Sequence, residues 1–176
     1  MFVDEEDQTL CKEKGCSGGL NADPTKPEAG IYFSGITPSK LGWYVDISPE
    51  MSEPLQNADG SFSYDISVDI TNVITREVAK KYTWYIVGGQ AGTYHSYLNL
   101  FAPAGGTISN FYVSTFKGNP FSKSDAFEYS GLEAYCLNMY VHPKQTINVS
   151  YTVTTSPEAL EPLKFSLTPT LSEYRD

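Results

Sequence analysis

Two histidines, His95 and His142, are the first residues to consider for catalysis or metal binding. Neither stands at ligand spacing from a cysteine, a carboxylate pair or the other histidine, and a metal site needs several converging ligands. Asn57-x-Asp59-Gly60 is similar to the start of a calcium loop, but the further oxygen ligands and the distal glutamate do not follow it. We therefore predict surface or turn histidines, an ordinary turn at residues 57–60, and no metal or other cofactor.

Signals for nucleophilic catalysis and phosphate binding are weak. No cysteine has the flanking pattern of a Cys–His pair, and Gly88–Gly89 lacks the Lys-Ser/Thr of a phosphate loop. Carboxylates are plentiful, and a glycosidase pair can converge from distant loops without a sequence signature. We predict that this chain is not an enzyme, with a glycosidase pair as the alternative that the residues leave open.

Three cysteines allow three pairings, each of which leaves one thiol unpaired. Cys11 and Cys16 enclose four residues, so a local disulfide between them is sensible in an oxidising compartment, and Cys136 then stays free. Reduced thiols are the alternative. The alternation of its strand places Cys136 on the face opposite Leu137.

Trp43 and Trp84, each followed by a tyrosine, are the candidate contacts for a glycan or a protein partner. Exposed aromatic rings stack on sugars and anchor protein contacts. Because adjacent strand residues face opposite ways, only one member of each Trp-Tyr pair can be exposed. Aromatic residues dominate β cores, so core packing is the competing interpretation and the one that we favour.

The elements that must position these residues are mostly strands. Residues 61–71 alternate without error, which predicts a half-buried antiparallel strand with one apolar face. The residues expected to face the core are Phe62, Tyr64, Ile66, Val68 and Ile70, with Ser63, Asp65, Ser67 and Asp69 on the other face. A second clean alternation predicts that Ile147, Val149, Tyr151 and Val153 face the core.

Further strands are predicted between frequent Gly, Pro and Asn turn signals. They are residues 31–36, 41–47, 93–101, 107–115, 126–130, 134–141, 146–155 and 163–168. About nine short strands indicate an all-β, antiparallel two-sheet sandwich, with a closed barrel as the alternative. One short helix is predicted over residues 75–85, with Thr75 as its N-cap and Gly88–Gly89 ending it.

At 176 residues the chain fits one domain. We expect an extended arm at 1–28, the sandwich at 29–172 and a short tail at 173–176.

The net charge of −9 argues against binding to nucleic acid and against adsorption to anionic lipid. No apolar run approaches the ~20 residues that span a bilayer, so we expect no membrane-spanning segment within this chain.

Four stretches of the chain resemble a known family. Residues 26–33 (KPEAGIYF) and 37–45 (TPSKLGWYV) are similar to the "GVYxNDxTxSKMxYYL" stretch of a large uncharacterised family of Gram-positive, largely actinobacterial, membrane-anchored cell-envelope proteins with a domain of unknown function. Residues 97–105 resemble that family's "YLPxG", and residues 142–146 resemble the start of its closing strand. The resemblance covers residues 26–170, the C-terminal part of such proteins.

The resemblance implies an extracytoplasmic, cell-surface location, with the export signal or anchor outside this chain. It carries over no catalytic residue. We expect a non-catalytic module with a structural, adhesion or assembly role, and its partner is a protein or a cell-wall glycan. The alternatives are a carbohydrate-binding module that recognises cell-wall or host glycan through surface aromatic residues, and part of a cell-wall polymer-acting enzyme. An aromatic platform in a groove would favour glycan binding, and a pocket of converging carboxylates would favour an enzyme.

Overall fold

The computed structural model describes residues 19–36, 39–88, 91–115 and 125–168. These residues form two mostly antiparallel sheets, so the prediction of an all-β two-sheet sandwich is confirmed. Sheet A has, in spatial order, β10 (Lys164–Leu167), β1 (Glu28–Gly35), β5 (Tyr94–Phe101), β8 (Leu132–Val141) and β7 (Phe127–Tyr129). Sheet B has β2 (Val45–Met51), β4 (Phe62–Asn72), β9 (Thr146–Thr154) and β6 (Thr107–Val113), and β3 (Leu55–Gln56) pairs with β4.

The strand β4 is the long central strand of sheet B, and its register follows the predicted alternation. Tyr64, Ile66, Val68 and Ile70 are at most 4% exposed, whereas Asp65 and Asp69 are exposed. The paired strand β9 buries Ile147, Val149, Tyr151 and Val153 in the same layer. Both core-face predictions are confirmed, except that Phe62 at the strand end is only half-buried.

The core lies between the sheets, where rings from opposite layers touch. Phe111 of β6 meets Tyr135 of β8 edge-on, with ring centroids 4.6 Å apart. A bulge in β6 brings Phe111 inward, because Asn110 takes a positive φ of 54° and the pairing with β9 shifts there. Asparagine tolerates this left-handed geometry better than most residues.

Sheet A contains the one parallel pair among the described strands, between β1 and the C-terminal β10. The amide of Phe33 in β1 also donates to the Thr168 hydroxyl at 2.9 Å, just beyond β10. The chain therefore returns at its C-terminal end to cover the edge of the strand on which the sandwich begins.

The strand predicted at 41–47 is wrong over its first half. Leu41–Tyr44 form a 3-10 turn, η1, and only then does β2 begin. The physical reason is a small second core, in which Leu41 packs with Ile74, Ala79 and Val87. Turning the backbone buries Leu41 completely.

The helix predicted at 75–85 is interrupted. It consists of two short helices, α2 (Arg76–Ala79) and α3 (Trp84–Val87), separated where Thr83 takes extended backbone angles. Thr75 caps α2 as predicted, because its hydroxyl accepts the Val78 amide at 3.1 Å. Gly88 ends α3 with a φ of 67°. Gly89 lies outside the described residues.

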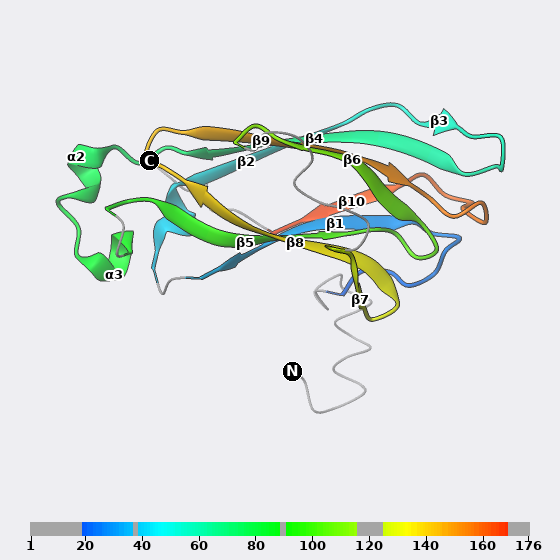
Figure 1. Ribbon diagram of the computed structural model, residues 1–176, viewed down its shortest axis with the longest axis horizontal. Helices are drawn as coiled ribbons and strands as arrows, with labels where there is room; N and C mark the ends of the chain where they lie inside the picture. The colour runs from blue at the N-terminus through cyan, green and yellow to red at the C-terminus, as the bar shows by residue number, and fades with distance from the viewer. Residues whose placement is uncertain (1–18, 37–38, 89–90, 116–124, 169–176) are drawn as a thin grey trace.

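Figure 1 shows the two layers along the long axis of the molecule, with α2 and α3 together at one end. The described part of the predicted arm, residues 19–27, leads directly into β1. Within the described residues, no helix is long and apolar enough to cross a membrane.

Candidate functional site: an aromatic groove on sheet A

The two tryptophans that the sequence marks as candidate contacts are both exposed. Trp43 is 44% exposed on η1 and Trp84 is 63% exposed at the start of α3. The expectation that they pack in the core is wrong, because neither lies on a strand of the sandwich. They lie at the end of the molecule that carries the two short helices.

Of the three cysteines, Cys136 is the one that the structure describes. Cys11 and Cys16 lie outside the described residues, so their disulfide stays a prediction. Cys136 is a free, exposed thiol on β8. Partial burial raises the pKa of this thiol, which lowers its reactivity at neutral pH because the thiolate is the nucleophile.

The histidines take part in local contacts. The His95 ring stacks on Tyr140 with centroids 4.0 Å apart, and its Nε2 lies 2.7 Å from the Asn138 Oδ1. His142 Nδ1 lies 3.1 Å from the Thr93 hydroxyl. Among the described residues, no group of three or more His, Cys, Asp or Glu side chains lies close enough together to hold a metal ion.

Residues 57–60 form the predicted turn, which is closed by the Gly60 amide donating to the Asn57 carbonyl at 3.1 Å.

Residues 15–19 read Gly-Cys-Ser-Gly-Gly and match the Gly-x-Ser-x-Gly pattern, with Ser17 as its serine. In hydrolases this pattern places the serine on a sharp turn between a strand and a helix. Residues 15–18 lie outside the described part. Residues 19–27 contain no helix and lead into β1, so the context of a nucleophile elbow is not met.

The outer face of sheet A gathers aromatic and amide side chains from four strands. Side chains point alternately to the two faces of a strand, so positions opposite the buried residues face outward. In sheet A these outward positions include the aromatic and polar residues Tyr32 and Ser34 of β1, Tyr97, Asn99 and Phe101 of β5, Cys136, Asn138 and Tyr140 of β8, and Phe127 and Tyr129 of β7, and also Glu28 of β1, His95 of β5 and Lys164 of β10. Glu28 and Lys164 form a charged pair at the β1–β10 edge of this face, 3.1 Å apart.

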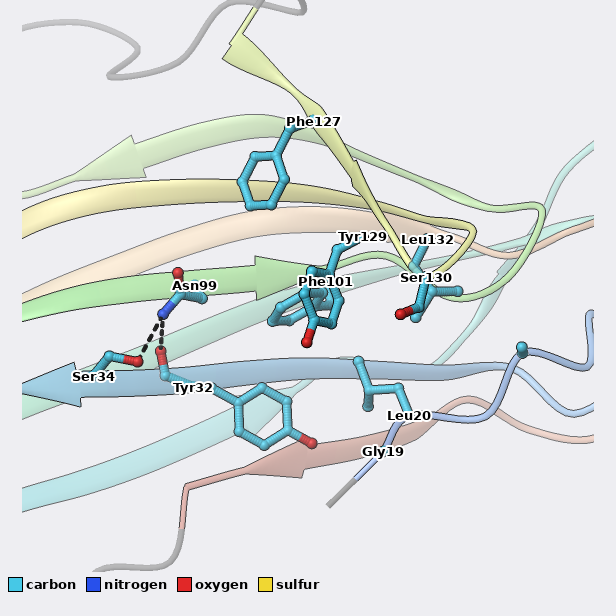
Figure 2. Close-up of a pocket in the computed structure, with 11 residues that line it drawn as sticks. Gly19, Leu20, Tyr32, Ser34, Asn99, Phe101, Phe127, Tyr129, Ser130 and Leu132 are labelled. Atoms are coloured by element: carbon cyan, nitrogen blue, oxygen red, sulfur yellow. Dashed lines mark hydrogen bonds between the residues drawn. The ribbon is translucent and has the colours of Figure 1, made fainter. Parts of the chain in front are cut away.

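A groove of about 660 Å³ opens on this face. Figure 2 shows three rings, Tyr32, Phe101 and Tyr129, that line it from three different strands, with Phe127 farther away on the same lining. Tyr32 and Phe101 meet edge-on at 5.8 Å, and Phe101 and Tyr129 do so at 5.7 Å. Phe127 is 42% exposed and Tyr129 is 60% exposed. The rings thus support one another and still offer free surface.

The segment before β1 closes one side of the groove. Leu20 lines it beside Tyr32. Gly30 allows this arrangement, because a Cβ at that position would lie 2.5 Å from the Tyr32 ring and 3.1 Å from Leu20. The orientation of Tyr32 therefore depends on a glycine two residues earlier in the same strand.

Polar groups lie beside the rings. The Asn99 side-chain amide donates to the Tyr32 carbonyl and to the Ser34 hydroxyl, both at 3.4 Å, and Figure 2 shows this group along the floor of the groove. Burial, together with the negative charge of Glu28, raises the pKa of Tyr32. The phenol therefore stays neutral and can donate a hydrogen bond over the physiological pH range.

A second, smaller hollow of about 390 Å³ brings two carboxylates together. Glu128 of β7 and Glu133 of β8 both line it and are directly opposite each other in register. The Glu133 Oε1 accepts the Ile108 amide at 3.0 Å, which ties β8 of sheet A to β6 of sheet B. One carboxylate of the pair therefore already has a structural partner.

The outer face of sheet B differs from that of sheet A. It carries short hydroxyl, amide and carboxylate side chains that bond across the strands. The Thr152 hydroxyl donates to Asp65 at 2.7 Å, and the Asn148 amide reaches Ser67 at 2.9 Å and Asp69 at 2.8 Å. These polar groups partner one another, whereas the aromatic rings of sheet A are open to a ligand.

Comparison with protein-family models, with curated proteins and with solved structures found no match for this chain. The resemblance to the envelope family stays a prediction.

The groove residues were not singled out from the sequence. Their signal is the set of aromatic residues at the outward positions of predicted strands, such as Tyr97 and Phe101 within residues 93–101. Which strands become neighbours depends on long-range pairing, so this signal becomes visible only when the sheet order is known.

Proposed function

We propose that this chain is a non-catalytic carbohydrate-binding module, and that the groove on sheet A binds a glycan. The single observation that carries the proposal is the groove of about 660 Å³, which is lined by the rings of Tyr32, Phe101 and Tyr129 and by no charged side chain among the described residues. Of the roles expected from the sequence, glycan binding is favoured over a purely structural role by this aromatic platform.

The chemistry of the groove suits a sugar. Aromatic faces stack on the apolar C–H surfaces of a pyranose, and amides and hydroxyls bond its hydroxyl groups. Asn99 and Ser34 supply such groups next to the rings. The described residues that line the groove carry no formal charge, which makes a neutral or weakly charged glycan a better ligand than a polyanion.

We propose further that the module belongs to an exported, membrane-anchored cell-envelope protein and acts outside the cytoplasm. The support is the family resemblance of residues 26–33 and 37–45. A cell-surface location would give the groove access to cell-wall or host glycan.

The enzyme alternative has one observation in its favour, the facing pair Glu128 and Glu133. The Glu133 carboxylate accepts a backbone amide between the sheets, which gives it a structural role. The pair lines the second hollow, which shares Phe127 with the aromatic groove but contains none of the three rings of Tyr32, Phe101 and Tyr129. We therefore propose binding without turnover.

The test is calorimetric titration of the protein with glycan fragments released from Gram-positive cell walls, using Tyr129→Ala. Loss of one stacking ring, at about 0.5–1.5 kcal/mol, weakens binding by about 2- to 12-fold. The matched control is Tyr112→Ala, which removes a ring 51% exposed on the outer face of sheet B. This control is expected to bind like the wild type.

Equal affinity of the Tyr129 and Tyr112 variants for the glycan would show that the groove is not the binding site. Release of reducing sugar during the titration, abolished in Glu128→Gln, would show that the chain is an enzyme. Melting temperatures of all variants check that the sandwich is intact.

A further inference from the structure

One end of the sandwich exposes an unusual run of side chains. All six residues from Lys80 to Tyr85, with the sequence KKYTWY, are exposed. Trp84 and Tyr85 are 63% and 55% exposed, and Trp43 on the neighbouring η1 is 44% exposed. Large exposed aromatic surface mostly marks an interaction site.

The aromatic residues are held in place. The Tyr44 and Tyr82 hydroxyls lie 3.0 Å apart, which joins η1 to the segment between α2 and α3. The Lys40 amide donates to the Ile86 carbonyl at 3.0 Å, and its Nζ lies 5.8 Å from the centre of the Tyr85 ring. Beneath them lies the second core that contains Leu41 and Ile74. The rings are therefore presented on a packed platform.

Positive charge gathers at the same place. We define the helical end as residues 39–44, 72–88, 91–93 and 142–145. The turn at 142–145 belongs to it because the Lys144 amide donates to the Asn72 carbonyl at 2.8 Å. Its charged side chains are Lys40, Arg76, Lys80, Lys81 and Lys144, with Glu77 as the acidic one.

The rest of the molecule has the opposite charge. In the described residues outside the helical end, Lys26 and Lys164 are the basic side chains against thirteen acidic ones. The net charge of −9 averages over this asymmetry. The net charge argued against adsorption to anionic lipid, but this argument does not apply to the helical end, whose own charge is positive.

We infer that the helical end is a peripheral docking surface for an anionic phospholipid bilayer. Tryptophan and tyrosine rings favour the headgroup level of a membrane, and lysine and arginine attract its phosphates. A neutral glycan would need no cluster of five cations. A soluble polyanion would satisfy the cations but would offer no hydrocarbon boundary for the rings of Trp84 and Tyr85.

The intrinsic tryptophan fluorescence of the chain can report vesicle binding, because its two tryptophans, Trp43 and Trp84, both lie on the helical end. Vesicles of equimolar phosphatidylglycerol and phosphatidylcholine are expected to shift the tryptophan emission to the blue and to sediment with the protein. Vesicles of phosphatidylcholine alone are expected to do neither. Salt should weaken the binding, since the attraction is partly electrostatic.

Two pairs of variants separate charge from aromatic contact. Lys81→Glu is expected to lower vesicle partitioning on the order of 30-fold, because it removes one attraction and adds one repulsion. Its control is Lys26→Glu, the same change at an exposed lysine outside the helical end. Tyr85→Ala should weaken binding several-fold, whereas Tyr112→Ala, of similar exposure, should not.

Absence of vesicle binding, or equal losses in the two lysine variants, would overturn the inference. An emission shift with soluble polyphosphate but not with vesicles would show a polymer site instead. Circular dichroism of each variant excludes loss of fold as the cause of lost binding.

Discussion

Glu28 is the clearest case in which one residue connects distant parts of the chain. Its carboxylate accepts the Asn21 amide at 3.1 Å and the Ser166 hydroxyl at 2.5 Å, and it lies 3.1 Å from the Lys164 ammonium. Burial works to raise the pKa of Glu28, but these hydrogen bonds and the Lys164 charge together lower it. The ionised form is therefore the form that holds the segment before β1 and the strand β10 together.

We predict that Glu28→Gln destabilises the fold in a pH-dependent way. A carboxylate whose pKa is lowered by folding stabilises the protein above its unfolded pKa, and this contribution is lost as the pH falls. At neutral pH the variant should be less stable by about 1.5–3 kcal/mol, the usual contribution of a hydrogen bond to a charged group. The difference should shrink as the pH drops below about 4.3, the ordinary pKa of glutamate.

Urea unfolding of wild type and variant across this pH range checks the prediction. Glu161→Gln is the control, because Glu161 is exposed and lies 3.8 Å from Lys26. Its effect should be near zero at every pH. A Glu28→Gln difference that does not depend on pH would mean that the charge of Glu28 contributes nothing to stability.

At the level of elements, Asn72 joins the ends of several strands. It is the last residue of β4 and is completely buried. Its side-chain amide donates to the Gly92 carbonyl at 2.8 Å, before β5, and to the Val141 carbonyl at 2.9 Å, at the end of β8. Its Oδ1 accepts the Ile74 amide at 3.2 Å. One side chain thus links both sheets to the helical end.

We predict that Asn72→Ala lowers the free energy of unfolding by about 2–4 kcal/mol, because it leaves three buried backbone groups without their partner. Thermal and urea unfolding measure the loss. Thr71→Ala is the control, since the Thr71 hydroxyl bonds Thr146 on the exposed face of sheet B. If both variants lost the same small amount, Asn72 would not hold the elements together.

The whole molecule has two differently specialised regions besides its core. The outer face of sheet A carries an aromatic groove with an uncharged lining, and the helical end is aromatic and basic. The core is built from central strands that are paired on both sides. These are β4 and β9 in sheet B and β1, β5 and β8 in sheet A. Such strands open only when the surrounding sheet opens.

We predict that hydrogen exchange follows this order. Amides of β4, β9, β5 and β8 should exchange most slowly, and those of β3, β7 and β10 fastest among the strands, because they lie at sheet edges and are short. Exchange measured by mass spectrometry on peptic peptides checks this. Protection in β7 as strong as in β8 would mean that β7 is held by more than its pairing with Leu132–Ala134.

The sequence predicted the strands well where one face is apolar and the other polar. In β4 the alternation fixes the register, because a shift by one residue would expose Ile66, Val68 and Ile70. The sequence also predicted the Thr75 cap, whose hydroxyl bonds a residue only three positions away. These features depend on neighbours in the chain, so local pattern is enough to determine them.

The tertiary structure alone decided the rest. Leu41 turns into the second core because Ile74 and Val87 lie beside it, and no local pattern places them there. The groove exists because Tyr32, Phe101 and Tyr129, far apart in the sequence, occupy neighbouring strands. Local sequence determines which way a side chain points on its strand. Only long-range strand pairing determines which side chains it meets there.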